Sequence, residues 1–236
     1  DRISNANQLT AALATRLIEP NSGAEIFKAM VGQRFNFERN KVGLSPSASS
    51  VTSNEDNWHK SDFLAAFSGQ VLPRVYADFA WQYTPAERET QRYSMGARYQ
   101  PEPGKVFNAA YRYNRAQSAP VDQIDVSGQW PLTGKLYAVG RLNYSFRDDG
   151  NLLSTSNTQK GRFIETLGGL EYNGGCWVVR GVIQRVTLTQ DNSSTGFFVQ
   201  LELNDFSRIG SNPINLLKRS IQGYGLINQP TGDSGY

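Results

Sequence analysis

The sequence predicts an all-β fold, an antiparallel transmembrane β-barrel, on the basis of three observations. Runs of about ten residues alternate apolar and polar side chains, as barrel strands do when one face meets lipid and the other meets water. The connections between these runs are alternately short and long. No apolar run approaches the roughly 20 residues that a membrane-spanning helix needs. The first two observations favour a barrel, and the third excludes a helical membrane protein.

The run from Val75 to Tyr83 shows the alternation most clearly. Its odd positions carry Val, Ala, Phe, Trp and Tyr, and its even positions carry Tyr, Asp, Ala and Gln. Successive side chains on a strand point to opposite faces, so this strand has one apolar face and one more polar face. The alternation predicts eleven strands, whose apolar positions span residues 9–17, 27–35, 63–71, 75–83, 93–99, 107–113, 124–130, 136–146, 164–172, 177–183 and 197–203.

The connections separate a barrel from a β-sandwich, which alternation alone does not do. The tight connections fall at residues 19–23, 72–74, 101–104, 131–134 and 173–175. The longer and more polar ones fall at residues 38–61, 84–88, 115–122, 147–161 and 187–194. Outer-membrane barrels have short periplasmic turns and longer external loops. This sorting therefore favours the barrel, and it predicts that Cys176 and the segment after Asn204 lie on the periplasmic side.

A short helix is expected after the last strand, within residues 212–223. Asn212 suits the N-cap, Pro213 the first helical position and Gly223 the C-terminal stop. Lys218 and Arg219 stand in the last turn, where the helix dipole favours cations. We therefore expect residues 5–204 to form the barrel portion, and residues 205–236 to form a periplasmic C-terminal tail that is disordered from Gln229 on.

Composition narrows the classes of function. Aromatic residues make up 11% of the 236 residues, and 22 are glycine, both of which fit a barrel with aromatic girdles; Trp130 and Trp177 are expected in the periplasmic girdle. The net charge of +3 is spread along the chain, so nucleic-acid binding is not expected. One cysteine and one histidine, His59 in a long loop, leave little material for a metal site or a catalytic triad. We expect no cofactor, no metal and no enzymatic activity.

Eleven is an odd number of strands. Bacterial single-chain barrels have even counts, because an odd count would pair the closing strands in parallel. The opening residues, Asp1–Asn5, also resemble the interior of a longer protein. Both observations predict that the chain is the C-terminal part of a larger barrel.

Four segments resemble the lipopolysaccharide-assembly outer-membrane protein family (LptD, also called Imp or OstA). They are Asp1–Thr10, Gly175–Arg180, Gly196–Leu203, and Leu217–Ile221 followed by Gly-Tyr. The resemblance covers nearly the whole chain. The first and last motifs are fairly specific, whereas the alternating strands between them are generic.

The resemblance implies a Gram-negative outer-membrane translocon that inserts lipopolysaccharide into the outer leaflet. Family members have a periplasmic N-terminal domain and a barrel of about 26 strands, with release proposed through a lateral gate between the first and last strands. The implied partners are lipopolysaccharide, a lipoprotein plug (LptE) in the lumen, the protein's own N-terminal domain, periplasmic bridge proteins and the barrel assembly machinery. This chain would supply about the last eleven strands.

Cys176 has two interpretations. It is either a small half-buried residue, or one partner of a disulfide, since the periplasm is oxidising. In the family, a cysteine or an adjacent pair at this position bonds the periplasmic domain. Here the motif holds a single cysteine, so one such bridge is possible, and its partner lies outside the chain.

The final strand also fits a recognition signal. Ser194, Gly196, Val199 and Leu201 match the pattern polar-x-Gly-x-x-apolar-x-apolar, which resembles the last-strand signal of the barrel assembly machinery. The same strand would border the lateral gate. The expected gate residues are Gly196, Phe197, Phe198, Val199, Gln200, Leu201, Glu202 and Leu203.

Five arginines fall on the polar faces and are candidates for the lumen wall. They are Arg92, Arg98, Arg112, Arg141 and Arg180. Arginine binds phosphate bidentately, so these side chains could guide the anionic head of lipopolysaccharide. The favoured alternative is ordinary lumen lining, paired with Asp78, Asp125 or Glu202, because a polar barrel interior needs no substrate to explain it.

Two other functions compete with the translocon. A general diffusion porin, or another outer-membrane channel, normally ends the chain with the last strand, whereas a helix-forming tail follows here. A barrel lipase or protease would need a Ser, His and acid constellation, and the single histidine makes this interpretation poor.

Overall fold

The computed structural model describes residues 8–37, 62–85, 88–115, 121–147, 161–187, 192–204 and 206–228. Three predictions concern residues outside these ranges. They are the first seven residues of the Asp1–Thr10 motif, the loop that holds His59, and the tail from Gln229 on.

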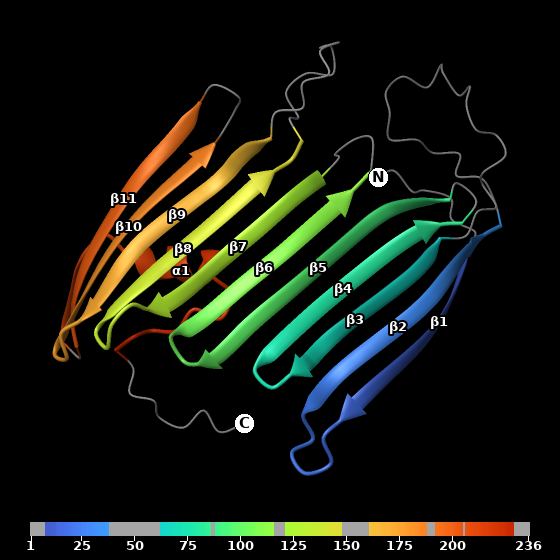
Figure 1. Ribbon diagram of the computed structural model, residues 1–236, viewed down its shortest axis with the longest axis horizontal. Helices are drawn as coiled ribbons and strands as arrows, with labels where there is room; N and C mark the ends of the chain where they lie inside the picture. Colours follow the sequence, from blue (N-terminus) through green and yellow to red (C-terminus); the bar gives the residue numbers. More distant parts are fainter. Residues whose placement is uncertain are drawn as a thin grey trace, which may run out of the picture.

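Twelve strands form one antiparallel sheet, in which each strand pairs with its neighbours in chain order (Figure 1). The all-β antiparallel prediction is confirmed. The sheet is open, and β1 and β12 are its two edges. The strands are β1 (Gln8–Ile18), β2 (Glu25–Asn36), β3 (Phe63–Leu72), β4 (Val75–Thr84), β5 (Glu89–Glu102), β6 (Lys105–Asn114), β7 (Val121–Pro131), β8 (Leu136–Ser145), β9 (Arg162–Asn173), β10 (Trp177–Thr187), β11 (Ser193–Leu203) and β12 (Ser207–Gly210).

The described part of the chain has twelve strands, one more than the eleven that the alternation predicts. The additional strand, β12, has four residues, too few for an alternation to be visible in the sequence. It pairs with Gln200–Leu203, the last part of β11. Twelve is an even number, so the argument that an odd count implies missing strands no longer holds.

One expected apolar position is also corrected. The sequence places Ile164 on the outward face of its strand, but a register shift opposite Asn143 and Tyr144 changes the alternation there. A bulge of this kind moves the next side chain to the other face. As a result Phe163 is the outward residue, 54% exposed, with its ring in edge contact with that of Tyr144.

The helix α1 (Pro213–Ser220) packs against one face of the sheet, which we call the inner face (Figure 1). It begins with Pro213 in its first turn, as expected, although the Asn212 side chain makes no capping hydrogen bond. The chain turns away near Gly223, whose φ of +82° is easily adopted only by glycine. No helix among the described residues is long and apolar enough to cross a membrane.

The inner face carries the hydrophobic core. Leu217 and Ile221 have no solvent exposure and meet apolar side chains from four strands. Those side chains are Val106, Val139, Leu167 and Val182. Val106 and Val139 lie near the short turns of β6 and β8, and Leu167 and Val182 lie at the middle of β9 and β10, so the helix covers the inner face from the short-turn end to the middle of the sheet.

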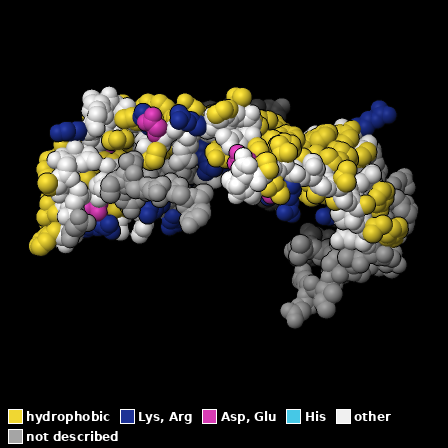
Figure 2. All heavy atoms as spheres, turned by 90° about the horizontal axis from the view of Figure 1, so that it is seen from below, with side chains coloured by type: hydrophobic (Ala, Val, Ile, Leu, Met, Phe, Trp, Pro, Cys, Tyr) yellow, Lys and Arg dark blue, Asp and Glu magenta, His cyan; other side chains and the backbone are white. Residues whose placement is uncertain are grey.

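The opposite, outer face is rich in exposed hydrophobic side chains. Leu13, Phe197 and Val199 are among the most exposed. Figure 2 looks at the short-turn end and shows hydrophobic side chains over the strands on the right and along the left margin, where β11 lies. Water disfavours an apolar surface of this extent on a soluble protein, whereas lipid does not.

Aromatic residues on the outer face form two rows. At the long-connection end, successive ring contacts involve Phe63, Trp81, Tyr83, Tyr93, Tyr111, Tyr113, Tyr144, Phe146 and Phe163. At the short-turn end, Tyr99 stacks with Trp130, and Tyr172 contacts Trp177. Two aromatic rows separated by an apolar band are typical of the interfacial girdles of a membrane barrel.

Candidate functional site

The edge of β11 differs between its two halves. From Gln200 to Leu203 this strand pairs with β12, and at Val199 the serine hydroxyl of Ser211 accepts from the backbone N–H at 2.8 Å. From Ser193 to Phe198, no described strand pairs with this edge. The short-turn half of β11 is therefore covered by β12, while the long-connection half is open in the part of the chain that the structure describes.

The eight residues predicted to line a gate divide between the two faces of β11. Phe197 points outward and is 71% exposed, and Val199 follows on the same face. Phe198 points inward and packs against the hydrophobic core, and Gln200 and Glu202 are buried on the inner face. The outward residues thus present an apolar surface, whereas the inward ones anchor the strand.

Beneath this edge lies a buried cluster of charges. Arg180 on β10 has no solvent exposure, and its Nε donates to Glu171 Oε1 at 2.9 Å. Its Nη1 pairs with Glu202 on β11, and Glu202 also accepts from Arg208 Nε on β12 at 2.9 Å. Antiparallel register places Arg180 opposite Glu171, so β9, β10 and β11 meet at one guanidinium, and β12 joins the cluster through Glu202. Buried charges are tolerated only when paired in this way.

The segment after α1 crosses the inner face and contacts successive strands. The Gln129 amide donates to the Gly225 carbonyl and accepts from its N–H, each at 3.0 Å. Asn108 donates to the Gln222 carbonyl at 2.9 Å, and Asn173 donates to the Ile227 carbonyl at 2.7 Å. The region expected as a separate tail is therefore bound to the inner face through residue 228.

Tyr224 joins this segment to the charge cluster. Its hydroxyl donates to Glu171 Oε1, the oxygen that also accepts from Arg180. Burial, with the Glu171 carboxylate close by, raises the pKa of Tyr224, which keeps the phenol protonated as a donor. The arrangement thus holds the segment after α1 against the sheet. Among the described residues there is no group of His, Cys, Asp or Glu side chains suited to a metal ion.

Cys176 lies in the short turn between β9 and β10. Its side chain is exposed and free in this structure. Its carbonyl accepts from the Asn204 N–H at 3.0 Å, which places it beside the connection from β11 to β12. The thiol is therefore accessible from the short-turn end.

Comparison with known proteins identifies the family. The sequence model of LPS transport system D (LptD) matches residues 1–136, more than half of the chain. The chain belongs to the LptD family.

Curated LptD relatives align over almost the whole chain. The LPS-assembly protein LptD of Aromatoleum aromaticum is 44% identical over 233 residues, covering 99% of this chain and 27% of the relative. The LptD protein of Azoarcus sp. is 42% identical, and the alignment covers 99% of this chain and 27% of that relative. That of Bordetella pertussis is 36% identical, covering 98% and 29%. The chain thus spans little more than a quarter of the length of these LptD proteins.

The five arginines proposed for the LptD lumen wall all lie on the inner face by strand alternation, but their environments differ. Arg141 pairs with Asp125 at 2.6 Å and with Glu165 at 3.0 Å, and Arg180 pairs as described above. The Arg98 guanidinium lies 5.0 Å from the centre of the Tyr76 ring. Two of the five therefore have the acidic partners that the lumen-lining interpretation expects, Asp125 and Glu202.

Arg92 and Arg112 are exposed on neighbouring strands near the long-connection end of the inner face. No described residue pairs with either guanidinium. Of the five arginines, these two have the environment that an anionic substrate would need.

Sequence reasoning missed four residues in and around the charge cluster. They are Glu171, Arg208, Tyr224 and Gln129, whose amide donates to Glu171 Oε2 at 2.9 Å. The signal available was an acidic residue between Leu170 and Tyr172, on the inward side of the strand. Its pairing with Arg180 depends on the register between β9 and β10, which alternation does not specify.

Proposed function

We propose that this chain forms the wall and one border of a lateral gate in an outer-membrane lipopolysaccharide translocon. The short turns face the periplasm and the long connections face outward, as in outer-membrane barrels. The single observation that carries the gate assignment is the asymmetry of β11, which pairs with β12 in its periplasmic half and with no described strand along the same edge of its outer half. The proposed partners are lipopolysaccharide, the LptE plug, the protein's own N-terminal domain, the periplasmic bridge proteins and the barrel assembly machinery.

The asymmetry fits release into the outer leaflet. A lipid leaving through an opening confined to the outer half of β11 would emerge at the level of the outer leaflet. Each backbone hydrogen bond that need not be broken lowers the cost of opening by about 0.5–1.5 kcal/mol. Phe197 and Val199, exposed on the outward face, offer an apolar surface for acyl chains. The inward anchors, Phe198 and Glu202, keep the strand in place.

A porin is not favoured by this geometry. The inner face at the short-turn end is occupied by α1 and by the segment through residue 228, which narrows the space that a diffusion channel would need. The LptD relatives are named LPS-assembly proteins, in agreement with a transport and assembly role.

The gate assignment predicts contact between lipopolysaccharide and the outer half of β11. A photoreactive amino acid in place of Phe197, in the full-length protein in cells, is expected to crosslink lipopolysaccharide. The same amino acid in place of Phe79, on the outer face of β4, is the matched control and should crosslink much less. Equal labelling at the two positions, measured by immunoblot, would show that lipopolysaccharide does not leave along β11.

The family resemblance also predicts a disulfide from Cys176 to the periplasmic N-terminal domain. The exposed thiol at the periplasmic end is in an oxidising compartment, where free thiols are uncommon. Cys176→Ser is expected to abolish the mobility difference between reducing and non-reducing gels of the full-length protein, with Ser127→Ala as a control that leaves it unchanged. An unchanged difference in Cys176→Ser would refute the bridge.

A further inference from the structure

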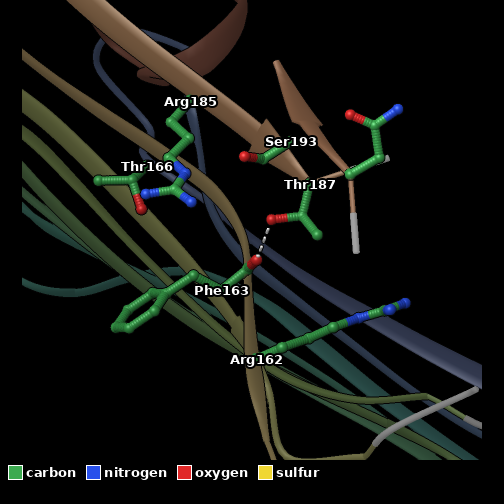
Figure 3. A pocket seen from close by; sticks show the side chains of 7 residues that line it. Arg162, Phe163, Thr166, Arg185, Thr187 and Ser193 are labelled. Carbon is green, nitrogen blue, oxygen red and sulfur yellow. Dashed lines mark hydrogen bonds between the residues drawn. The ribbon is translucent and has the colours of Figure 1, made fainter. Parts of the chain in front are cut away.

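A polar pocket opens beside the open half of the β11 edge. It has a volume of about 360 Å³ and lies where β9, β10 and β11 reach the long connections (Figure 3). Its lining residues are Arg162, Phe163, Thr166, Arg185, Thr187, Asn192 and Ser193. We call this feature the edge pocket.

The edge pocket interrupts the outer face between its apolar band and the aromatic row at the long-connection end. Antiparallel register places Arg185 between Thr166 on β9 and Thr195 on β11. Thr166 in turn lies opposite Leu142 of β8, an exposed residue of the apolar band. The aromatic row at the long-connection end reaches β9 through the ring contact of Tyr144 with Phe163. On β10 and β11, no described aromatic residue continues this row, and the guanidinium of Arg185 and the hydroxyl groups of the edge pocket take its place.

Arg185 has no ionic partner among the described residues, although other cations near strand ends do. Arg115 pairs with Glu89 at 2.8 Å, and Lys105 pairs with Glu102 at 2.7 Å. Arg185 is exposed on a face that otherwise meets lipid. A cation on the lipid-facing surface of a barrel is unfavourable, and increasingly so toward the membrane midplane, unless an anion accompanies it.

The rest of the edge pocket supplies hydrogen-bond donors and a fixed frame. In Figure 3 the Thr166 side chain lies beside the Arg185 guanidinium, and the Ser193 hydroxyl points into the same region. The Thr187 hydroxyl donates to the Phe163 carbonyl at 2.8 Å, which fixes the ends of β9 and β10 to one another. The phenyl ring of Phe163 forms the border toward the aromatic row.

We propose that the edge pocket binds a phosphate group on the head of lipopolysaccharide as the lipid leaves the gate for the outer leaflet. A guanidinium binds phosphate through two parallel, charge-assisted hydrogen bonds, and neighbouring hydroxyl groups add further donors. The position next to the open edge places the phosphate at the exit while the acyl chains lie along Phe197 and Val199. This inference rests on the proposed function, and it names the chemical group that the exit recognises.

The test places a photoreactive amino acid at Thr195, opposite Arg185, in full-length protein reconstituted with lipopolysaccharide. Arg185→Gln is expected to lower crosslinking at Thr195 by about tenfold or more, because it removes the charge-assisted hydrogen bonds to the phosphate. Lipopolysaccharide lacking its lipid A phosphates should give the same loss with the unchanged protein. Arg115→Gln removes a paired arginine at the same end of the sheet and should leave crosslinking unchanged.

Three results would overturn the proposal. Crosslinking at Thr195 that persists in Arg185→Gln would remove the role of the guanidinium. Equal crosslinking of phosphatidylglycerol vesicles would show that any anionic lipid suffices, and full competition by inorganic phosphate would show a site for free phosphate. Crosslinking at Phe197 separates this proposal from the gate itself. If Phe197 labels lipopolysaccharide while Arg185→Gln has no effect, only the edge pocket is refuted, and if Phe197 does not label it, the proposed function fails.

Discussion

Replacing Arg180 with alanine is expected to destabilise the protein by about 3–5 kcal/mol, because it leaves two buried carboxylates without their shared partner. Glu171 and Glu202 both pair with this guanidinium, which has no solvent exposure. Loss of the pairing would weaken the contact of β10 with β9 and β11 and, through Arg208, the attachment of β12. The measurement is the urea denaturation curve of the full-length protein in lipid vesicles, with and without the substitution.

Two variants distinguish the effect of leaving Glu171 and Glu202 unpaired from the effect of removing an arginine side chain. Arg208→Gln removes the other arginine that pairs with Glu202. Because the Arg208 side chain is 57% exposed, this substitution should change the free energy of unfolding by no more than about 1 kcal/mol. The triple variant Arg180→Met, Glu171→Gln, Glu202→Gln leaves no unpaired buried charge, since Arg208 is exposed, and should recover most of the loss, because neutral replacements of buried ion pairs are often tolerated. If the triple variant were as unstable as Arg180→Ala, charge burial would not be the cause.

The strands that the sequence predicts correctly are those for which the information is local. A strand that alternates over ten residues, such as β4, shows its two faces in its own sequence, and Phe79 and Tyr76 lie on the faces that the alternation predicts. The start of the helix was predictable for the same reason, because Pro213 favours the first helical turn, whereas the helix ends at Ser220, three residues before the expected stop at Gly223.

The features that the sequence did not predict depend on partners far along the chain. β12 has only four residues and is a strand because β11 supplies its hydrogen-bond partners. Glu171 and Tyr224 are separated by 53 residues and meet because α1 docks on the core. The outward position of Phe163 follows from a bulge in the pairing with β8. None of these features has a periodic signal, since each is determined by tertiary contacts and by register.

Leu217→Ala is expected to weaken the docking of α1 by about 2–5 kcal/mol, because it leaves a cavity in a core that excludes solvent completely at this residue. The segment through residue 228 would then detach more often, exposing the helix to protease. The rate of trypsin cleavage after Lys218 and Arg219 in the purified full-length protein measures this release. Asn215→Ala, on the exposed side of the same helix, is the matched control and should keep the wild-type rate.

The same variant tests whether α1 holds the half of the proposed gate beside β12 closed, the half that we propose faces the periplasm. β12 connects β11 to α1 through a short segment, so release of α1 also frees β12 from Gln200–Leu203. Without β12 the edge of β11 would be open along its whole length, and a photoreactive amino acid at Leu201 should then crosslink lipopolysaccharide, which it should not do in the wild type. Cleavage that increases without new crosslinking at Leu201 would mean that β12 remains paired on its own, and that the charge cluster around Arg180, rather than α1, keeps the gate closed on the periplasmic side.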